Sequence, residues 1–89
     1  MLVRVRLLGS LRPPGIPKEI EVEIPADSKI ASLIEELSRL YPEIASSLIN
    51  SSTVNLIMLE GIEVGNLEGL DTFLDQNATV IIVPVTHGG

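Results

Sequence analysis

The chain has 89 residues, of which 45% are hydrophobic but only Tyr41 and Phe73 are aromatic, so we expect one small domain with an aliphatic core. Its net charge of −6 argues against direct nucleic-acid binding, because phosphate contacts need Lys and Arg. The absence of cysteine excludes disulfides, thiolate metal sites and a cysteine nucleophile, and no apolar run approaches the ~20 residues that span a bilayer. We therefore expect a cytoplasmic protein that does not bind membranes.

The first part of the chain predicts a β-hairpin. Apolar and charged residues alternate over residues 2–8 and again over residues 18–24, as in strands with one buried face. The segment between them, residues 9–17, is rich in glycine and proline, which favour turns. In an antiparallel pair, Arg4 and Arg6 would share the exposed face with the glutamates of the second strand.

A change of period then predicts one main helix over Lys29–Leu40. Ser28 is the expected N-cap, and the helix should end at Tyr41, because the residue before a proline disfavours helical geometry. Residues 43–50 would add a short extra turn. The apolar residues recur every three or four positions, which is the spacing of one helix face: Ile30, Leu33, Ile34 and Leu37.

The second half of the chain predicts three more strands. An apolar run at residues 54–59 indicates a central strand, residues 62–64 a short one, and the β-branched residues of 78–85 a final central strand. This order predicts an α+β protein of the β-grasp (ubiquitin-like) fold, with a mixed four- to five-stranded sheet, one main helix and the last strand beside the first. Residues 1–85 would form the domain and residues 86–89 a flexible tail. The loop before the last strand holds four residues that we expect to tuck beneath the sheet: Leu67, Leu70, Phe73 and Leu74.

The interior of the predicted domain offers no group of residues suited to catalysis. His87 is the single histidine, so no His-based metal site or triad can be assembled. Gly61, Gly65 and Gly69 are spaced four apart, but no lysine follows them as a phosphate-binding loop requires. We therefore expect a protein that is not an enzyme, with no metal and no tightly bound cofactor.

The two terminal glycines, Gly88 and Gly89, are the candidate reactive end of the chain. A carboxylate becomes electrophilic only as an acyl-adenylate, and an activating enzyme has to grip it in a narrow channel. Two residues without Cβ let the backbone pass where a side chain would clash. Five extended residues from Val85 span about 17 Å, enough to bring the Gly89 carboxylate into a partner's active site. The opposing interpretation is a terminus without function.

Several segments resemble ubiquitin-like sulfur carriers, and the resemblance covers nearly the whole chain. Leu8–Arg12 (LGSLR) is similar to the opening of molybdopterin synthase small subunits, and Gly69–Thr72 (GLDT) is similar to their archaeal members. The ending Pro84–Gly89 (PVTHGG) is similar to theirs and to that of the ubiquitin-related modifier. The same family includes the archaeal small modifier proteins.

The resemblance implies that a ubiquitin-activating-type enzyme uses ATP to adenylate Gly89, which is then converted to a thiocarboxylate. It implies three destinations: a molybdopterin synthase large subunit, a tRNA-thiolating enzyme, or lysines of target proteins. Synthase small subunits usually carry two prolines and a small residue before the glycines, whereas Pro84 stands alone here, which favours the modifier branch. Thr86, His87 and Gly88 would enter the partner's channel, with His87 either fitting a groove or assisting proton transfer.

The strand alternation also indicates a docking face. If Val80 and Ile82 face the helix, the residues between and after them point outward, because adjacent strand residues alternate. An exposed apolar patch of this kind marks a partner site. The alternative is that a loop covers the patch or that the parity is shifted by one residue. The candidate partner-binding residues are Leu56, Met58, Ile81, Val83 and Val85.

Three classes of function remain open at this point. The first is a carrier or modifier whose terminal carboxylate reacts in a partner enzyme. The second is a β-grasp adaptor, an interaction module whose terminal glycines are incidental. The third is a catalytic subunit, and the lack of suitable side chains argues against it.

Overall fold

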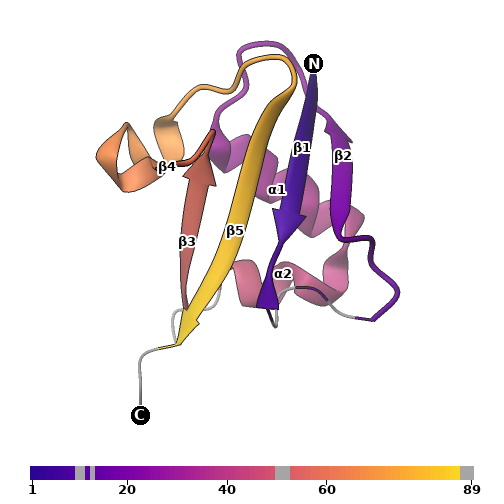
Figure 1. Cartoon of the computed structure of the whole chain (residues 1–89). Helices are drawn as coiled ribbons and strands as arrows, with labels where there is room; N and C mark the ends of the chain where they lie inside the picture. Colours follow the sequence, from indigo (N-terminus) through magenta and orange to yellow (C-terminus); the bar gives the residue numbers. More distant parts are fainter. Residues whose placement is uncertain (10–11, 13, 50–52, 87–89) are drawn as a thin grey trace.

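The computed structural model describes residues 1–9, 12, 14–49 and 53–86. Five strands form one sheet in the order β2-β1-β5-β3-β4 (Figure 1). Strand β1 is antiparallel to β2 and parallel to β5, and β3 is antiparallel to β5 and β4. The predicted hairpin, mixed sheet and β-grasp fold are confirmed. In chain order the elements are β1 (Leu2–Leu7), β2 (Glu19–Glu23), α1 (Ile30–Leu40), α2 (Pro42–Ile49), β3 (Thr53–Leu59), β4 (Ile62–Glu63), the 3₁₀ turns η2 (Val64–Asn66) and η3 (Gly69–Asp71), and β5 (Ala78–Thr86).

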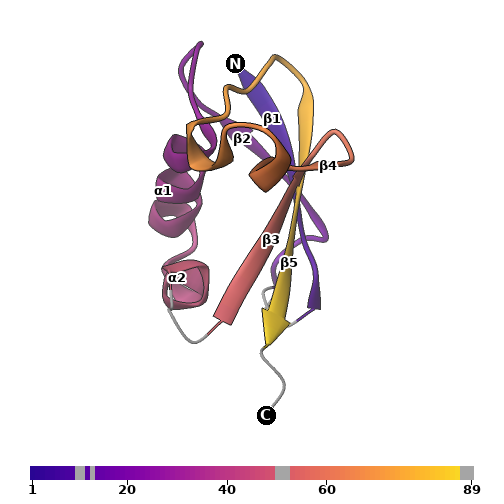
Figure 2. The same cartoon turned by 90° about the vertical axis from the view of Figure 1, so that its left-hand side faces the viewer.

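The core lies between one face of the sheet and the two helices, and no described helix covers the other face (Figure 2). Three residues of the predicted helical stripe, Ile30, Leu33 and Leu37, are fully buried, and Ile34 packs against them half-buried. None of the described helices is long and apolar enough to cross a bilayer. Alternate strand residues complete this aliphatic core: Val3, Val5, Leu7, Ile20, Val22, Val80 and Ile82.

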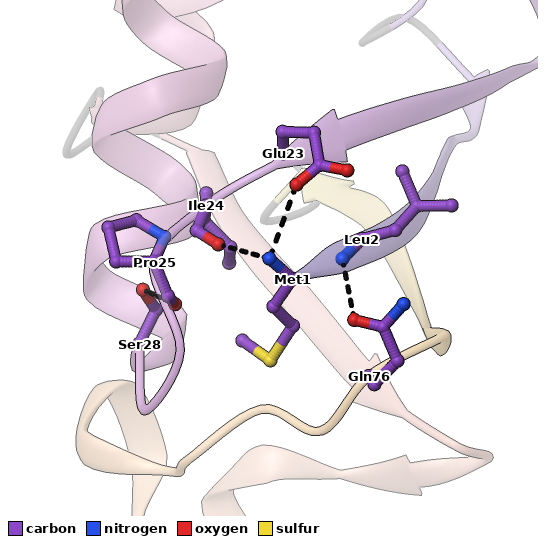
Figure 3. Close-up of polar contacts among 7 residues, drawn as sticks. All are labelled: Met1, Leu2, Glu23, Ile24, Pro25, Ser28 and Gln76. Atoms are coloured by element: carbon purple, nitrogen blue, oxygen red, sulfur yellow. Dashed lines mark hydrogen bonds and ion pairs between the residues drawn. The ribbon is translucent and has the colours of Figure 1, made fainter.

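The start of α1 differs from the prediction. The helix begins after Lys29, which is its N-cap and makes no side-chain capping bond. The Ser28 hydroxyl instead donates to the Pro25 carbonyl at 2.6 Å (Figure 3). The Ser28 carbonyl accepts from the Leu74 N–H at 2.9 Å. Ser28 is therefore not the N-cap, because its hydroxyl closes the preceding turn and its backbone holds the segment before β5.

Polar contacts also hold the end of the sheet where β1 begins. The amino group of Met1 donates to the Ile24 carbonyl at 2.8 Å, and the Leu2 N–H donates to Gln76 Oε1 at 3.0 Å (Figure 3). The Asn77 N–H donates back to the Leu2 carbonyl at 2.7 Å. These bonds join β1, the end of β2 and the turn that leads into β5.

The segment after α1 is a second helix, α2, where the sequence predicted only a short turn. Pro42 begins it, since proline lacks only an N–H that the first helical turn does not use. Ile44 is fully buried and Leu48, one helical turn later, packs against the core. This i, i+4 apolar pair stabilises two turns rather than one.

The connection between β4 and β5 departs most from the prediction. Leu74 is buried as expected, but Leu67, Leu70 and Phe73 are exposed, so the prediction that all four tuck beneath the sheet is wrong for three of them. The cause is the backbone around Phe73. Thr72 and Leu74 both point into the protein, and an extended chain alternates its side chains, so Phe73 points out.

Candidate functional site

The face of the sheet without helices carries an apolar patch. In β5, Ile82 is fully buried, whereas its neighbours Ile81 and Val83 are only half-buried on the other face. On β3, Met58 lies opposite Ile81 and Leu56 lies opposite Val83. The predicted strand parity is confirmed. We refer to these four residues, together with the exposed Val85 two residues further along β5, as the outer patch: Leu56, Met58, Ile81, Val83 and Val85.

Charged residues flank the outer patch on both sides. Arg6 of β1 is the register partner of Ile81, and Glu19 of β2 is the register partner of Arg6. On the other side, Glu63 of β4 lies opposite Met58. One row of residues therefore crosses the sheet with an acidic residue at each edge, in the order Glu19, Arg6, Ile81, Met58 and Glu63. The predicted sharing of one face by arginines and glutamates is confirmed by this register.

Arg6 belongs to this site although the sequence analysis did not assign it there. Its Nε is buried and has no hydrogen-bond partner among the described residues. Its register partner Ile81 places the positively charged side chain directly beside the apolar residues of the patch. The signal in the sequence was the predicted pairing of the first and last strands, which makes a β1 arginine a neighbour of the β5 patch.

Strand β5 continues past the end of β1 and is there paired with β3. The Leu8 N–H donates to the Ile82 carbonyl at 3.0 Å, and Pro84 has no N–H with which to continue that ladder. On the β3 side, the register continues to Thr86, which is paired with Thr53. The last part of β5 is therefore a strand supported by β3.

Gly9 directs the chain away from this end of β5. Its φ is +59°, and a Cβ at this position would lie 3.3 Å from Cγ of Pro84. Glycine is favoured here both because it tolerates the left-handed conformation and because it leaves room for Pro84. The segments that resemble the opening and the ending of sulfur carriers thus meet in space.

The predicted tail overlaps β5 by one residue. Thr86, which the sequence analysis placed in the tail, lies in β5, because its pairing with Thr53 extends the strand. His87, Gly88 and Gly89, the other predicted tail residues, lie outside the described residues.

The described part of the chain also carries charged groups elsewhere. No group of three His, Cys, Asp or Glu side chains among the described residues is placed to hold a metal ion. On α1, a hydrogen bond from Arg39 lowers the pKa of Glu36, and the same bond raises the pKa of Arg39. This pair lies on the helical side, so the candidate site consists of the outer patch, its flanking charges and the end of β5.

Solved structures share this architecture, whereas no protein-family model matches the chain and no curated protein matches its sequence. The solution structure of the HVO 2177 protein of Haloferax volcanii aligns with a TM-score of 0.83 at 26% identity, over 100% of this chain and 87% of that one. The small archaeal modifier protein 1 of Methanosarcina acetivorans aligns with a TM-score of 0.80 at 23% identity, over 99% of this chain and 96% of that one. A putative molybdopterin converting factor, subunit 1, from Pyrococcus furiosus aligns with a TM-score of 0.70 at 20% identity, over 93% of this chain and 95% of that one.

A chain in the crystal structure of the BexX/CysO complex of Amycolatopsis orientalis is also similar, with a TM-score of 0.75 and 17% identity over 98% of this chain and 99% of that one. The identities are low, and the coverage is nearly complete in both directions. The resemblance to ubiquitin-like sulfur carriers is thereby confirmed for the fold: the chain is a β-grasp protein built like the archaeal small modifier proteins and the molybdopterin converting factor subunit.

Proposed function

We propose that this chain is a ubiquitin-like sulfur carrier or protein modifier whose reactive group is the carboxylate of Gly89. The observation that carries the proposal is the end of β5, a strand that β3 supports through Thr86. Such a strand gives the tail a fixed origin, and Gly88 and Gly89 let it enter a narrow channel. The fold shared with a small archaeal modifier protein and a molybdopterin converting factor subunit supports the same role.

The chemistry belongs to a ubiquitin-activating-type partner that uses ATP. A carboxylate oxygen of Gly89 attacks the α-phosphorus of ATP and pyrophosphate leaves, which gives an acyl-adenylate. Hydrosulfide, free or delivered by a sulfur donor, then attacks the carbonyl carbon; AMP leaves with the bonding electron pair, and a thiocarboxylate remains. This chain supplies the carboxylate and no catalytic side chain, and His87 fits the partner's groove.

Docking of the activating enzyme takes place on the outer patch. The patch includes Val85, so a protein bound there lies beside the origin of the tail, and the three residues after β5 span about 10 Å when extended. Apolar area removed from water supplies affinity, and the positive charge of Arg6 beside Ile81 favours an acidic group on the partner. The BexX/CysO complex supports a protein partner for a chain of this fold.

The sulfur or the whole chain then passes to an acceptor. The candidates are a molybdopterin synthase large subunit, a tRNA-thiolating enzyme and lysines of target proteins. The single Pro84 before the tail favours the modifier branch. Purification of the chain with its bound proteins, followed by their identification, separates the three.

The test of the proposal is intact mass spectrometry after incubation with ATP, a sulfur donor and an activating enzyme. A carrier gains the mass that results from replacing one oxygen by sulfur. Deletion of Gly89, or the substitution Gly88→Leu, should eliminate this gain. Neither change should alter the melting temperature, because both residues lie beyond β5.

An added alanine after Gly89 is the sharpest variant, because it keeps both glycines and moves the carboxylate by about 3.3 Å. We expect it to be nearly as damaging as the deletion. The substitution Leu40→Ser, at an exposed position of α1, is the control and should be activated normally. If the extended and truncated chains are still converted where no protease can trim them, the adaptor hypothesis replaces the carrier.

A further inference from the structure

A second apolar surface lies where η2 and η3 connect β4 to β5. The three most exposed large apolar side chains among the described residues are Phe73 (59%), Leu70 (54%) and Ile62 (50%), and Leu67 follows at 42%. All four occur between β3 and β5 in the sequence. We call three of them the η corner: Leu67, Leu70 and Phe73.

The backbone of the η corner is anchored on both sides of Phe73. The Thr72 carbonyl accepts from the Ile30 N–H at 3.0 Å, and the Leu74 N–H donates to the Ser28 carbonyl at 2.9 Å. The side chains of Thr72 and Leu74 are buried. Phe73 cannot turn inward without breaking this pairing. The exposure of the chain's single phenylalanine is therefore built into the fold and does not reflect a loose loop.

The turn that carries Leu70 is held in a similar way. Thr72 Oγ1 accepts from the Glu68 N–H at 3.1 Å, and the Thr72 N–H donates to the Gly69 carbonyl at 3.1 Å. Lys29 Nζ lies 3.7 Å from an oxygen of Asp71 and 5.2 Å from the centroid of the Phe73 ring. Hydrogen bonds thus fix the backbone that carries Leu70 and Phe73, and the neighbouring lysine already has a carboxylate and an aromatic ring as partners.

The sequence that carries the η corner is acidic, and Lys29 beside Phe73 is a basic neighbour of it. All six Lys and Arg residues lie within residues 4–39, and residues 40–89 contain six acidic residues and no Lys or Arg. A partner segment that presents Lys or Arg around apolar side chains would be attracted, and an acidic one repelled. Five of the six acidic residues lie in the segment that forms the corner or adjoins it: Glu60, Glu63, Glu68, Asp71 and Asp75.

The η corner is far from the origin of the tail. It precedes the start of β5, and the tail follows the end of β5, nine residues further on (Figure 1). At about 3.3 Å per residue, a strand of this length separates the two by roughly 26 Å. Two partners can therefore occupy the two ends of the molecule together.

We propose that the η corner is a docking site for a basic amphipathic segment of a partner protein. The site goes beyond the carrier function and does not depend on Gly89. Its apolar residues supply the contact area, and the surrounding carboxylates select Lys and Arg. A β-grasp carrier built in this way can be held by one protein at the η corner while another protein engages its tail.

Selection of peptides from a random library displayed on phage tests the proposal. The full chain is the target, after depletion of the library on the double variant Leu70→Ser/Phe73→Ser. Enriched peptides should combine Lys or Arg with apolar residues. A synthetic copy of the most enriched peptide should bind the wild-type chain at least tenfold more tightly than it binds the double variant. Added salt should weaken its binding to the wild-type chain. Leu40→Ser, an equally polar change at an exposed leucine of α1, should bind like wild type.

The charge reversal Glu68→Lys leaves the apolar side chains in place and should also weaken peptide binding. It keeps the test valid if the double variant proves unstable. Enriched peptides without basic residues, or no enrichment over the depleted library, would overturn the proposal. A wild-type dimer in sedimentation that the double variant loses would assign the surface to a second copy instead. Adenylation of Gly89 is measured on the same variants, and its persistence when peptide binding is lost separates this site from the proposed carrier function.

Discussion

Ile81 and Ile82 are adjacent residues of the same type in the same strand, and they have different surroundings. Ile82 is fully buried beside Leu7 on the helical side of the sheet. Ile81 is half-buried between Arg6 and Met58 on the face without helices. Strand alternation alone separates the two. One row of β5 side chains thus holds the fold together, and the other row is free to meet a partner.

The difference has an energetic meaning. Full burial of an isoleucine side chain contributes about 1.5–3 kcal/mol, and Ile82 has realised that contribution within the monomer. Ile81 still exposes part of its surface, so part of the same free energy is available to a complex. The predictions below test whether stability and docking separate along the strand in this way.

The largest effect on stability is expected from Ile82→Ala. The substitution removes a fully buried side chain from the core and should lower the free energy of unfolding by about 2–5 kcal/mol. Leu33→Ala and Leu37→Ala should do the same on the helix side. Urea unfolding measures the loss. Ile81→Ala is the matched control and should cost roughly 1 kcal/mol; equal losses at both isoleucines would contradict the two-row interpretation.

The next effect concerns docking, and Ile81→Asp should show it. A carboxylate in the middle of the outer patch would have to be desolvated in the complex, so activation should fall by about a hundredfold or more. The isolated chain should remain folded, because Ile81 is not part of the core. The assay is ATP-dependent adenylation at fixed enzyme concentration, with Leu40→Asp as the control. Normal activation of a folded Ile81→Asp chain would place the docking face elsewhere.

Local patterns were sufficient for most of the fold because the periods along this chain are unambiguous. The alternation around Val3 and Val5 and the three-to-four spacing of Leu33 and Leu37 each show which face is buried. The parity of the outer patch followed in the same way from the β-branched run of β5. The tail assignment of His87, Gly88 and Gly89 stays a prediction, since these residues lie outside those the structure describes.

Features that depend on distant partners were not predictable. Ser28 and Phe73 were misplaced because their positions follow from hydrogen bonds between residues 28–30 and 72–74, which are far apart in sequence. Arg6 was missed because its role requires the register of β1 against β5, not the pattern of β1 alone. The four-residue spacing of Ile44 and Leu48 is typical of a helix of two turns. In so short a segment, one such pair was not enough to predict a second helix.

Gly9→Ala should produce a smaller loss of stability and tests how the end of β5 is built. The left-handed φ costs an alanine about 1–2 kcal/mol, and the added Cβ also crowds Pro84 at 3.3 Å. Gly69→Ala is the matched control, because Gly69 has the same φ of +59° and no heavy atom would lie within 4 Å of its Cβ. Thermal unfolding should show the larger loss at Gly9. Equal losses would mean that Pro84 moves freely and does not constrain the strand end.

The smallest effect is expected on the helical side, at the pair of half-buried Glu36 and exposed Arg39. The hydrogen bond from Arg39 lowers the pKa of Glu36, so the folded pKa is below the unfolded one. The pair's contribution to stability is therefore present above the unfolded pKa, near 4.3, and is lost as the pH falls through the folded pKa. Because Arg39 is exposed and solvent screens the pair, Glu36→Gln should leave the melting temperature and activation at pH 7 nearly unchanged. An NMR titration of the Glu36 carboxyl carbon checks the cause: its midpoint should rise in Arg39→Gln, and an unchanged midpoint would show that the hydrogen bond does not persist in solution.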